Sequence, residues 1–372
     1  MELINQTGFE ADWSLGFQRN GRELAIIVAK ATFSLPSDEN AAPELPPAAR
    51  QVPLTGPDEF TGTPGYSAVL HETDFAHFKS RCDVLFNGSA HGPHEQPEQS
   101  VVVGLKVGAM CKSLRVVGDR LWAGSRFHPR PDAPIPFVSK PISYDVAFGG
   151  MHEGSADGTK PYCLRANPVG RGYHPDPDAA WLRQTLLPNT EEVGRPVRSP
   201  SATYRPMSLG AIGRNFAERA PLAGTFDQHW LDNVAPFWPD DFRYEYFQCA
   251  PSDQRIDYPK GGEPVVLRNL TRGGLLRFVL PTLDLSVLAS RYRGNDAMHA
   301  MAIDTIFIEP AFGHMTMTCR VAIPMARSLF DLRRLIVGET PKLRIALRSR
   351  GKPHYASPKA FLEANPQFGA RR

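Results

Sequence analysis

Alternating hydrophobic and polar positions along the chain predict short β-strands. Over residues 101–107 every second residue is Val or Leu, which is the period of two of a strand with one buried face. Residues 23–35 are a β-branched run that ends at a proline, as is typical of a largely buried strand. Residues 302–309 and 314–321 predict a hairpin with its turn at 310–313. The alternation of its second strand predicts a buried face that carries the Met residues and a face that contacts water.

Helical periodicity is confined to two segments, residues 178–186 and 325–337. The 35 Pro and 31 Gly among 372 residues require frequent turns, which favours many short strands over long helices. We therefore expect a mainly β fold of antiparallel, β-sandwich-like sheets, with a long irregular central block and a short C-terminal helix.

Composition divides the chain into four regions. Strand patterns lie on both sides of a block rich in Gly, Pro and aromatic residues. These two strand regions form either one β-domain or two related β-units. Each region has a turn marked by Gly and then paired apolar strands, but the two show no residue-level repeat. The expected regions are an N-terminal β-unit (1–150), an irregular block packed on the β-units (151–262), a C-terminal β-unit with a helix (263–350) and a tail (351–372).

The central block is the most informative part of the chain. Residues 144–270 have little periodicity, yet five Phe or Trp lie between positions 226 and 242. A flexible linker is poor in apolar groups, because without them it cannot offset the entropy of ordering. We therefore interpret the block as an ordered, packed surface, and long ordered loops are more often functional than connecting segments.

Charge and cysteine usage exclude several classes of protein. The net charge is +3 and the basic residues are scattered, whereas nucleic-acid binding needs a concentrated basic surface. No apolar run approaches the length of a membrane span, and the first residues lack a signal-peptide pattern. The five cysteines are odd in number and form no CxxC pair, which argues against disulfides and structural zinc. We expect a cytoplasmic protein without cofactors that binds neither nucleic acid nor membrane.

Catalytic motifs are missing from the sequence, and we expect no enzymatic activity. It has no phosphate-binding GxxxxGK[ST] or GxGxxG motif and no GxSxG elbow; residues 88–92 only superficially resemble the elbow. His91 and His94 are spaced like zinc ligands on a helix, but Gly92-Pro93 between them breaks any helix. The segment His71-Glu72-Thr73-Asp74 is explained more simply as a polar strand edge.

Acidic residues near the tryptophans suggest an alternative function. Asp227, Asp241 or Glu263 would supply carboxylates to a carbohydrate-binding or carbohydrate-active β-sandwich, with Trp residues as stacking platforms. That function requires two of these carboxylates to face each other across a cleft. Capping of a turn or helix is the competing interpretation for an Asp that follows Trp-Pro.

An ordered series of motifs carries a family resemblance. The series is Val28 to Phe33, Asp83-Val-Leu, Lys112 to Trp122, Pro136-Phe137, Tyr144 to Gly150, Asn167-Pro168-x-Gly170, Leu187-Pro188-Asn189, Ala223 to Trp230, Pro239-x-Asp241-Phe242, Ala250-Pro-x-Asp253-Gln254 and Gly261-Gly262-Glu263. Over residues 3–320 the chain resembles a bacterial domain-of-unknown-function family encoded in type VI secretion clusters, beside spike-tip PAAR proteins, valine-glycine-repeat (VgrG) spike proteins and toxic effectors. Cys319-Arg320 departs from the Trp-Arg pair expected at the end of the domain.

The resemblance implies an adaptor or chaperone that binds an effector or its PAAR-containing carrier noncovalently and helps to load it onto the spike. Aromatic anchors dominate the energetics of protein interfaces, so the block supplies the candidate contacts. The candidate partner-binding residues are Trp181, Trp230, Phe237, Trp238, Asp241, Phe242 and Tyr246. For each of these aromatic residues, packing beneath the block is the alternative role.

A second set of motif residues is expected to shape the backbone rather than to contact a partner. Glycine pairs permit turns with positive φ, which side chains disfavour. The residues assigned to this structural role are Phe148, Gly149, Gly150, Asn167, Gly170, Gln254, Gly261, Gly262 and Glu263.

Overall fold

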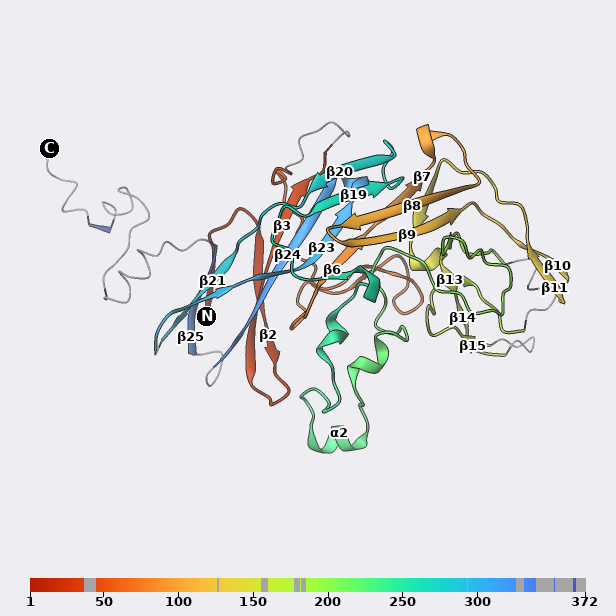
Figure 1. The fold of residues 1–372 in the computed structure, drawn as a ribbon. Coiled ribbons are helices and arrows are strands. Elements are labelled where there is room, and N and C mark those ends of the chain that lie inside the picture. Colours follow the sequence, from red (N-terminus) through yellow and green to blue (C-terminus); the bar gives the residue numbers. More distant parts are fainter. Residues whose placement is uncertain are drawn as a thin grey trace.

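The chain folds into β-sheets joined by long loops (Figure 1). The computed structural model describes residues 1–36, 45–125, 127–154, 160–176, 181, 185–292, 294–325, 331–338, 351 and 364–365. The mainly β, largely antiparallel fold expected from the sequence is confirmed.

The largest sheet has six strands. In spatial order they are β18 (Arg255–Ile256), β6 (Cys82–Phe86), β23 (Ala302–Glu309), β24 (His314–Pro324), β3 (Glu23–Ser34) and β2 (Glu10–Phe17). The predicted hairpin is confirmed as β23–β24, joined by the 3₁₀ turn η6 (Pro310–Phe312). The predicted buried strand is β3, which pairs with β2 and β24.

Two further sheets complete the scaffold. One has five strands in the order β17 (Thr190–Glu191), β9 (Met110–Val117), β8 (Ser100–Val107), β19 (Pro264–Arg268) and β20 (Leu275–Val279). The other has four strands in the order β1 (Glu2–Asn5), β25 (Leu332–Val337), β21 (Ser286–Arg291) and β22 (Ala297–Ala300). Fully buried residues from all three sheets form one hydrophobic cluster, for example Ile27, Leu105, Met317 and Leu335. Burying each such side chain contributes about 1.5–3 kcal/mol, so this cluster is the main stabilising feature.

The predicted C-terminal helix is wrong where the structure describes that segment. Residues 332–337 form β25, which pairs in parallel with β1 and antiparallel with β21. The tertiary pairing outweighs the approximate helical spacing of the leucines, because β25 buries hydrophobic residues against the core as a strand. The other predicted helix, 178–186, lies outside the described residues apart from Trp181, Thr185 and Leu186.

Strands from both ends of the sequence share the same sheets. β6 pairs in parallel with β23, β3 pairs with β24, and β8 pairs with β19. The N-terminal and C-terminal strand regions therefore form continuous sheets in space. The boundaries expected near residues 150 and 263 stay a prediction.

The second face of β24 is buried, contrary to the expectation that it contacts water. Thr316, Thr318 and Arg320 are each less than 6% exposed. Arg320 pairs with Asp304 (Nε–Oδ2 3.2 Å) and donates to the Ala76 carbonyl (3.1 Å). The segment before β6 and the central block therefore cover this side of the six-stranded sheet, and ion pairs satisfy the charges that the block buries.

The central block contains only short elements, as its lack of periodicity predicted. They and the remaining small elements are β4 (Glu59–Phe60), β5 (Val69–His71), β7 (Gly88–His91), η1 (Pro93–Glu95), β10 (Trp122–Ser125), β11 (His128–Pro131), β12 (Ser139–Ile142), η2 (Tyr144–Val146), β13 (Phe148–Gly149), β14 (Met151–His152), β15 (Tyr162–Cys163), β16 (Arg171–Gly172), η3 (Ala220–Ala223), α2 (Gln228–Asn233), η4 (Tyr244–Phe247) and η5 (Ser252–Gln254). Within the described ranges, no helix is both long and apolar enough to span a membrane.

Candidate partner-binding arm

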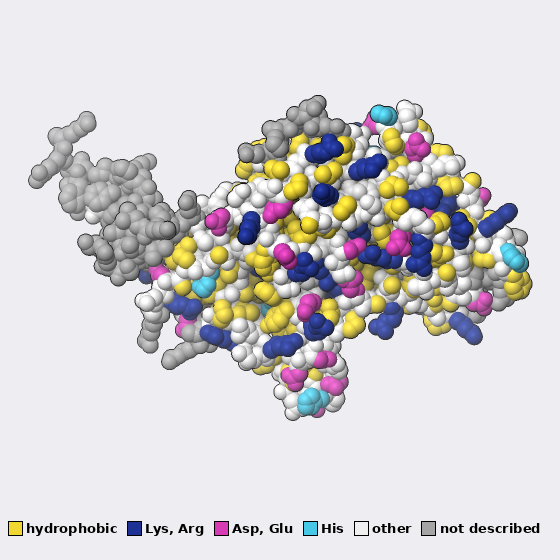
Figure 2. Space-filling model, in the orientation of Figure 1, with side chains coloured by type: hydrophobic (Ala, Val, Ile, Leu, Met, Phe, Trp, Pro, Cys, Tyr) yellow, Lys and Arg dark blue, Asp and Glu magenta, His cyan; other side chains and the backbone are white. Residues whose placement is uncertain are grey.

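Residues 220–243 form an arm that projects from the body of the molecule (Figures 1 and 2). It begins with η3, carries α2 at its far end and returns to the body at Arg243, whose amide donates to the Leu222 carbonyl (2.9 Å). The arm presents Trp230, Phe237 and Asp241 of the predicted partner-binding set, whereas Trp238 and Phe242 of the same segment pack into the body. Several residues of the arm, such as Phe226 and Leu231, are exposed.

Asp227 starts the helix at the tip of the arm. Its carboxylate accepts a hydrogen bond from the Trp230 amide (2.9 Å), the N-cap arrangement that satisfies an otherwise unpaired helical N–H group. The Trp230 ring packs edge-on against Phe226 with centroids 4.8 Å apart. Its Nε1 donates to the Phe237 carbonyl (2.9 Å), which connects α2 to the irregular segment that returns to the body.

Asp241 braces the two sides of the arm. Its carboxylate accepts hydrogen bonds from the Thr225 amide and the Thr225 hydroxyl, both at 2.8 Å. These hydrogen bonds lower the pKa of Asp241 because they favour its charged form. The neighbouring Gly224 has φ +83°, and a Cβ there would lie 2.7 Å from the Asp241 carboxylate. The predicted contact residue Asp241 is therefore engaged within the arm itself.

Phe237 is one of the aromatic residues that anchor the arm to the body. The Phe237 ring packs against Phe17 at the end of β2, with centroids 5.8 Å apart. It also covers Gly21 in the β2–β3 turn, where an added Cβ would approach the ring to 3.1 Å. Phe237 thus fixes the direction in which the arm projects.

The base of the arm is held by a buried ion pair. Arg219, directly before η3, is fully buried and binds Glu72 through two hydrogen bonds. Burial alone would raise the pKa of Glu72, but the charges of Arg219 and Arg214 lower it below its ordinary value. Arg219 also donates to the carbonyls of Ile212 and Tyr246 (both 2.7 Å), so it links three segments at this point.

Two hydrophobic side chains at the tip remain exposed. Phe226 is 53% exposed and Leu231 is 58% exposed, on either side of the Asp227 cap. The sequence reasoning did not single out these two residues. The start of the helix was a usable signal, because the residue before an N-cap and the fourth helical residue often pack together. Here these residues are Phe226 and Leu231, and both are exposed to solvent.

Three other predicted contact residues lie in a buried aromatic cluster. Phe242 is fully buried and stacks on Trp238 with centroids 4.3 Å apart, and Tyr246 and Phe247 complete the cluster. Phe242 is therefore a core residue, which corrects its assignment as a partner contact. Trp238 and Tyr246 are partly buried in the same packing.

Trp181 lies in a different cluster. It packs beside buried Trp122 and Phe148, and its ring lies 4.6 Å from that of His174. The structure therefore brings Trp230 and Phe237 together on the arm and places Trp181 elsewhere.

Asn167 organises the backbone of the first structural motif. It is fully buried and its amide donates to the carbonyls of Tyr144 (2.9 Å) and Phe148 (3.2 Å). A Cβ on Gly149 would lie 2.2 Å from the backbone carbonyl oxygen of Asn167. A Cβ on Gly170 would lie 2.2 Å from the side-chain nitrogen Nδ2 of Asn167. These glycines are therefore required by close backbone approach, next to Gly150 at φ +130°.

Gln254 joins the two largest sheets. Its amide donates to the carbonyls of Val84 on β6 (2.7 Å) and Leu209 (2.9 Å), and its oxygen accepts from the ammonium of Lys112 on β9 (2.7 Å). In the second glycine motif, Gly261 and Gly262 have φ +94° and +86°. Glu263 accepts from the Gly261 amide (2.9 Å), so that motif is a capped turn before β19.

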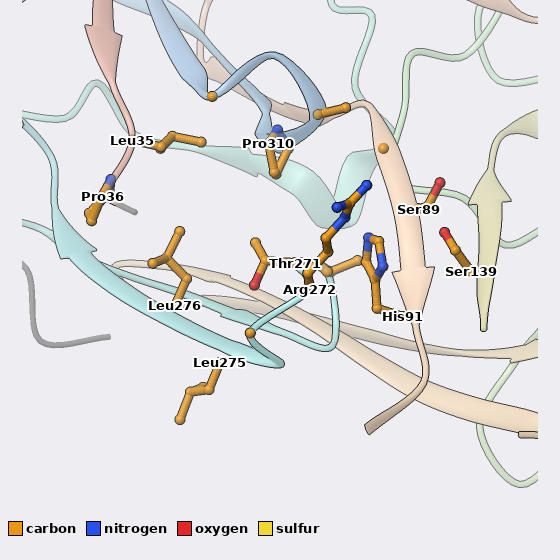
Figure 3. A pocket seen from close by; sticks show the side chains of 15 residues that line it. Leu35, Pro36, Ser89, His91, Ser139, Thr271, Arg272, Leu275, Leu276 and Pro310 are labelled. Carbon is orange, nitrogen blue, oxygen red and sulfur yellow. The ribbon is translucent and has the colours of Figure 1, made fainter. Parts of the chain in front are cut away.

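A cavity of about 770 Å³ lies between the β19–β20 turn, β7 and the β23–β24 turn (Figure 3). Ser89 and His91, from the GSAHG segment, both line it because they alternate on β7. Arg272 lies beside His91, and its charge together with burial lowers the pKa of that histidine. Most of the remaining lining is apolar, with Leu276 as one example.

The acidic and histidine side chains of the segment His71 to Asp74 are committed to other partners. His71 bonds Glu59 (2.8 Å) and the buried Glu309 (3.0 Å), while Glu72 binds Arg219 and Asp74 pairs with Lys30. Among the described residues, no group of three or more His, Cys, Asp or Glu side chains could hold a metal ion. The sequence reasoning missed Glu309, because 238 positions separate it from His71.

The carboxylates named for carbohydrate chemistry are each bound within their own loop. Asp227 caps α2, Asp241 binds Thr225 and Glu263 caps its turn. None of them lines the cavity of Figure 3. The facing pair that this alternative requires is not formed by these contacts.

The fold and the arm define a mainly β protein that presents a braced surface loop. The chain belongs to a bacterial protein family: residues 20–320 match the family described as "Uncharacterized protein conserved in bacteria (DUF2169)". No curated protein and no solved structure matches the chain.

Proposed function

We propose that this protein is an adaptor that binds a protein partner through the tip of the arm. The observation that carries the proposal is the exposure of Phe226 and Leu231 on a projection that the Asp241 and Asp227 hydrogen bonds brace. Large apolar side chains are the usual anchors of protein interfaces, where burying them excludes water. Both lie on the same short segment, so a single apolar pocket on a partner would cover them.

The construction of the arm suits recognition. Binding costs free energy when loops become ordered, so a segment that is already ordered loses less on association. The Asp227 cap and the Asp241 brace hold the tip in one conformation before any partner arrives. Polar residues of α2, such as His229 and Asp232, are exposed around the apolar pair and would form the rim of the contact.

The partner class follows from the family resemblance. Residues 223–230 and 239–242, which belong to the motif series of the type VI secretion family, are the ones that build the arm. The adaptor holds an effector or its PAAR-containing carrier in the cytoplasm and helps to load it onto the valine-glycine-repeat spike. If the arm contacts a component that type VI secretion systems share, we expect family members to share the motif that builds the arm.

Co-purification tests the proposal. Tagged protein is isolated from cells that carry its neighbouring genes, and bound proteins are identified by mass spectrometry. We expect stoichiometric recovery of an effector or PAAR protein, and a loss of about tenfold or more with F226A/L231A, since interface anchors contribute about 2 kcal/mol or more. The control F312A/I135A removes side chains that are 69% and 65% exposed elsewhere and retains the partner. Failure to recover such a protein, or equal loss in both variants, contradicts the proposal.

A further inference from the structure

The five-stranded sheet has an outward face that is separate from the arm. Its inward residues, such as Leu105 and Leu267, belong to the main core. On the outward face, Lys106 of β8, Arg268 of β19 and Arg277 of β20 are exposed. We call this surface the basic face. Figure 2 shows Lys and Arg side chains interspersed with hydrophobic ones over the region where Figure 1 places β8, β19 and β20.

Strand register brings these charges close together. Val266 on β19 lies directly opposite both Lys106 and Arg277, so one strand separates the two charged residues. Neighbouring strands are about 4.8 Å apart, which places their backbones about 10 Å from each other. Arg268 is two residues along the same strand from Val266 and points to the same side. The three cations therefore form a compact triangle around an apolar centre.

No carboxylate among the described residues forms an ion pair with these three cations. Other exposed arginines do have such a partner, as Arg81 has Asp257 and Arg334 has Glu2. Arg115 on β9 likewise has no ion-pair partner among the described residues, and Glu191, its register neighbour on β17, is bound to Arg120 (2.7 Å). Like charges on neighbouring strands repel, so these cations are available to pair with carboxylates of another molecule.

Apolar groups separate the charges and indicate the kind of partner. Val102 is 42% exposed, and Val266, Leu275 and Val279 are half-buried on the same side. None of the outward positions of β8, β9, β19 and β20 is aromatic, so the face offers no platform for stacking nucleic-acid bases. Carboxylates placed between apolar side chains complement this arrangement in both charge and polarity.

We propose that the basic face is a second docking surface, and that it binds an acidic protein surface in which carboxylates alternate with apolar side chains. Carboxylates of the partner pair with Lys106, Arg268 and Arg277 while its apolar groups cover Val266. This contact is independent of the arm, so it holds or fails separately from the proposed adaptor site.

Charge reversal provides the test. The probe is a synthetic peptide of Glu, Leu and Ala, and binding to the full chain is measured by fluorescence anisotropy at low ionic strength. The test variant is R268E/R277E. The matched control is R130E/R198E, which reverses two exposed arginines without ion pairs on other parts of the surface. F226A/L231A serves as a second control that alters the arm only.

We expect the peptide to bind the wild-type chain, with affinity that falls when salt shortens the Debye length from about 14 Å to about 4 Å. R268E/R277E loses about tenfold or more in affinity, while both controls bind as the wild type does. No binding to the wild type, or equal loss in R130E/R198E, overturns the proposal. Tighter binding of oligothymidylate of equal charge, with the same dependence on Arg268 and Arg277, overturns the assignment to a protein partner.

Discussion

Arg219 and Glu72 form a two-pronged ion pair at the base of the arm, with Nη1–Oε2 at 3.0 Å and Nη2–Oε1 at 2.6 Å. Arg219 is fully buried and Glu72 nearly so. The pair joins the start of the projecting arm to the segment before β6, which supplies Glu72. It therefore ties the arm to the segment that leads into the largest sheet. Its loss would release the arm and leave Arg214 as the remaining ion-pair partner of Glu72.

Breaking this ion pair should destabilise the protein strongly. R219M removes the two-pronged partner of the nearly buried Glu72 carboxylate and leaves the part-exposed Arg214 (Nη2–Oε1 3.0 Å) as its remaining ion-pair partner. Breaking a buried ion pair costs about 3–5 kcal/mol. The free energy of unfolding, measured by urea denaturation, provides the readout. R81M, which breaks the exposed pair of Arg81 with Asp257, should cost no more than about 1 kcal/mol. Similar losses in the two variants would refute the structural role of Arg219.

Removing the brace of the arm should loosen its tip without unfolding the sheets. D241A eliminates both hydrogen bonds to Thr225. Hydrogen exchange should quicken at the Thr225 and Trp230 amides and remain unchanged in β3 and β24. D240A is the matched control, because the adjacent Asp240 is exposed and makes none of these contacts. Unchanged exchange across residues 220–243 in D241A would show that the brace does not order the arm.

A methyl group at Gly149 should disrupt the first glycine motif. The Cβ of G149A would lie 2.2 Å from the Asn167 carbonyl oxygen, so the backbone must shift. Overpacking of this kind costs about 1–3 kcal/mol, measured as a lower free energy of unfolding. In G104A the new Cβ has its nearest neighbour at 3.6 Å, so the change should be much smaller. Equal stability of G149A and wild type would rule out the close approach.

His71 should make stability depend on pH. Burial lowers the pKa of His71, but its hydrogen bonds to Glu309 and Glu59 outweigh burial and raise the pKa above its ordinary value. Only the protonated ring donates to both carboxylates. A raised folded-state pKa means that this stabilisation is complete below the unfolded pKa of about 6.5 and is lost as pH rises through the folded value. The pKa of Glu309 is lowered in spite of burial, because His71 and Asn87 hydrogen-bond its carboxylate, so its stabilisation is lost at acidic pH.

The measurement is the free energy of unfolding across pH 6 to 9 for wild type and H71Q. The wild type should lose stability as pH rises, and H71Q should lose most of this dependence. H128Q, which alters an exposed histidine that forms no ion pair with any residue the structure describes, should behave as the wild type does. An identical pH profile for H71Q and wild type would show that His71 is not the titrating group.

Local sequence patterns predicted the strands better than their partners. The alternation over 101–107 correctly identified β8, because one face of that strand packs on the core. The same pattern could not reveal that β8 pairs with β19, since pairing across more than 150 residues depends on tertiary contacts. In β24 the polar alternate residues suggested contact with water, but ion pairs such as Arg320 with Asp304 allow that face to be buried.

The sequence pointed to the block that contains the proposed contact, but not to the residues that the fold exposes there. The density of aromatic residues singled out this block, because such residues must pack somewhere. It could not distinguish Phe242, which is fully buried, from Phe226, which is exposed. That distinction depends on the Asp227 cap and the Asp241 brace, which orient the tip and are set by contacts within the folded arm.

The central claim is that the tip of the arm touches the partner, and site-specific photo-crosslinking tests it most directly. A photoreactive phenylalanine analogue replaces Leu231 in the full chain, and a matched variant carries it at the exposed Phe312. After irradiation in cells that contain the neighbouring genes, we predict a crosslink to an effector or PAAR protein from position 231 and none from position 312. The absence of a crosslink at 231 while the partner still co-purifies would contradict the arm as the binding site.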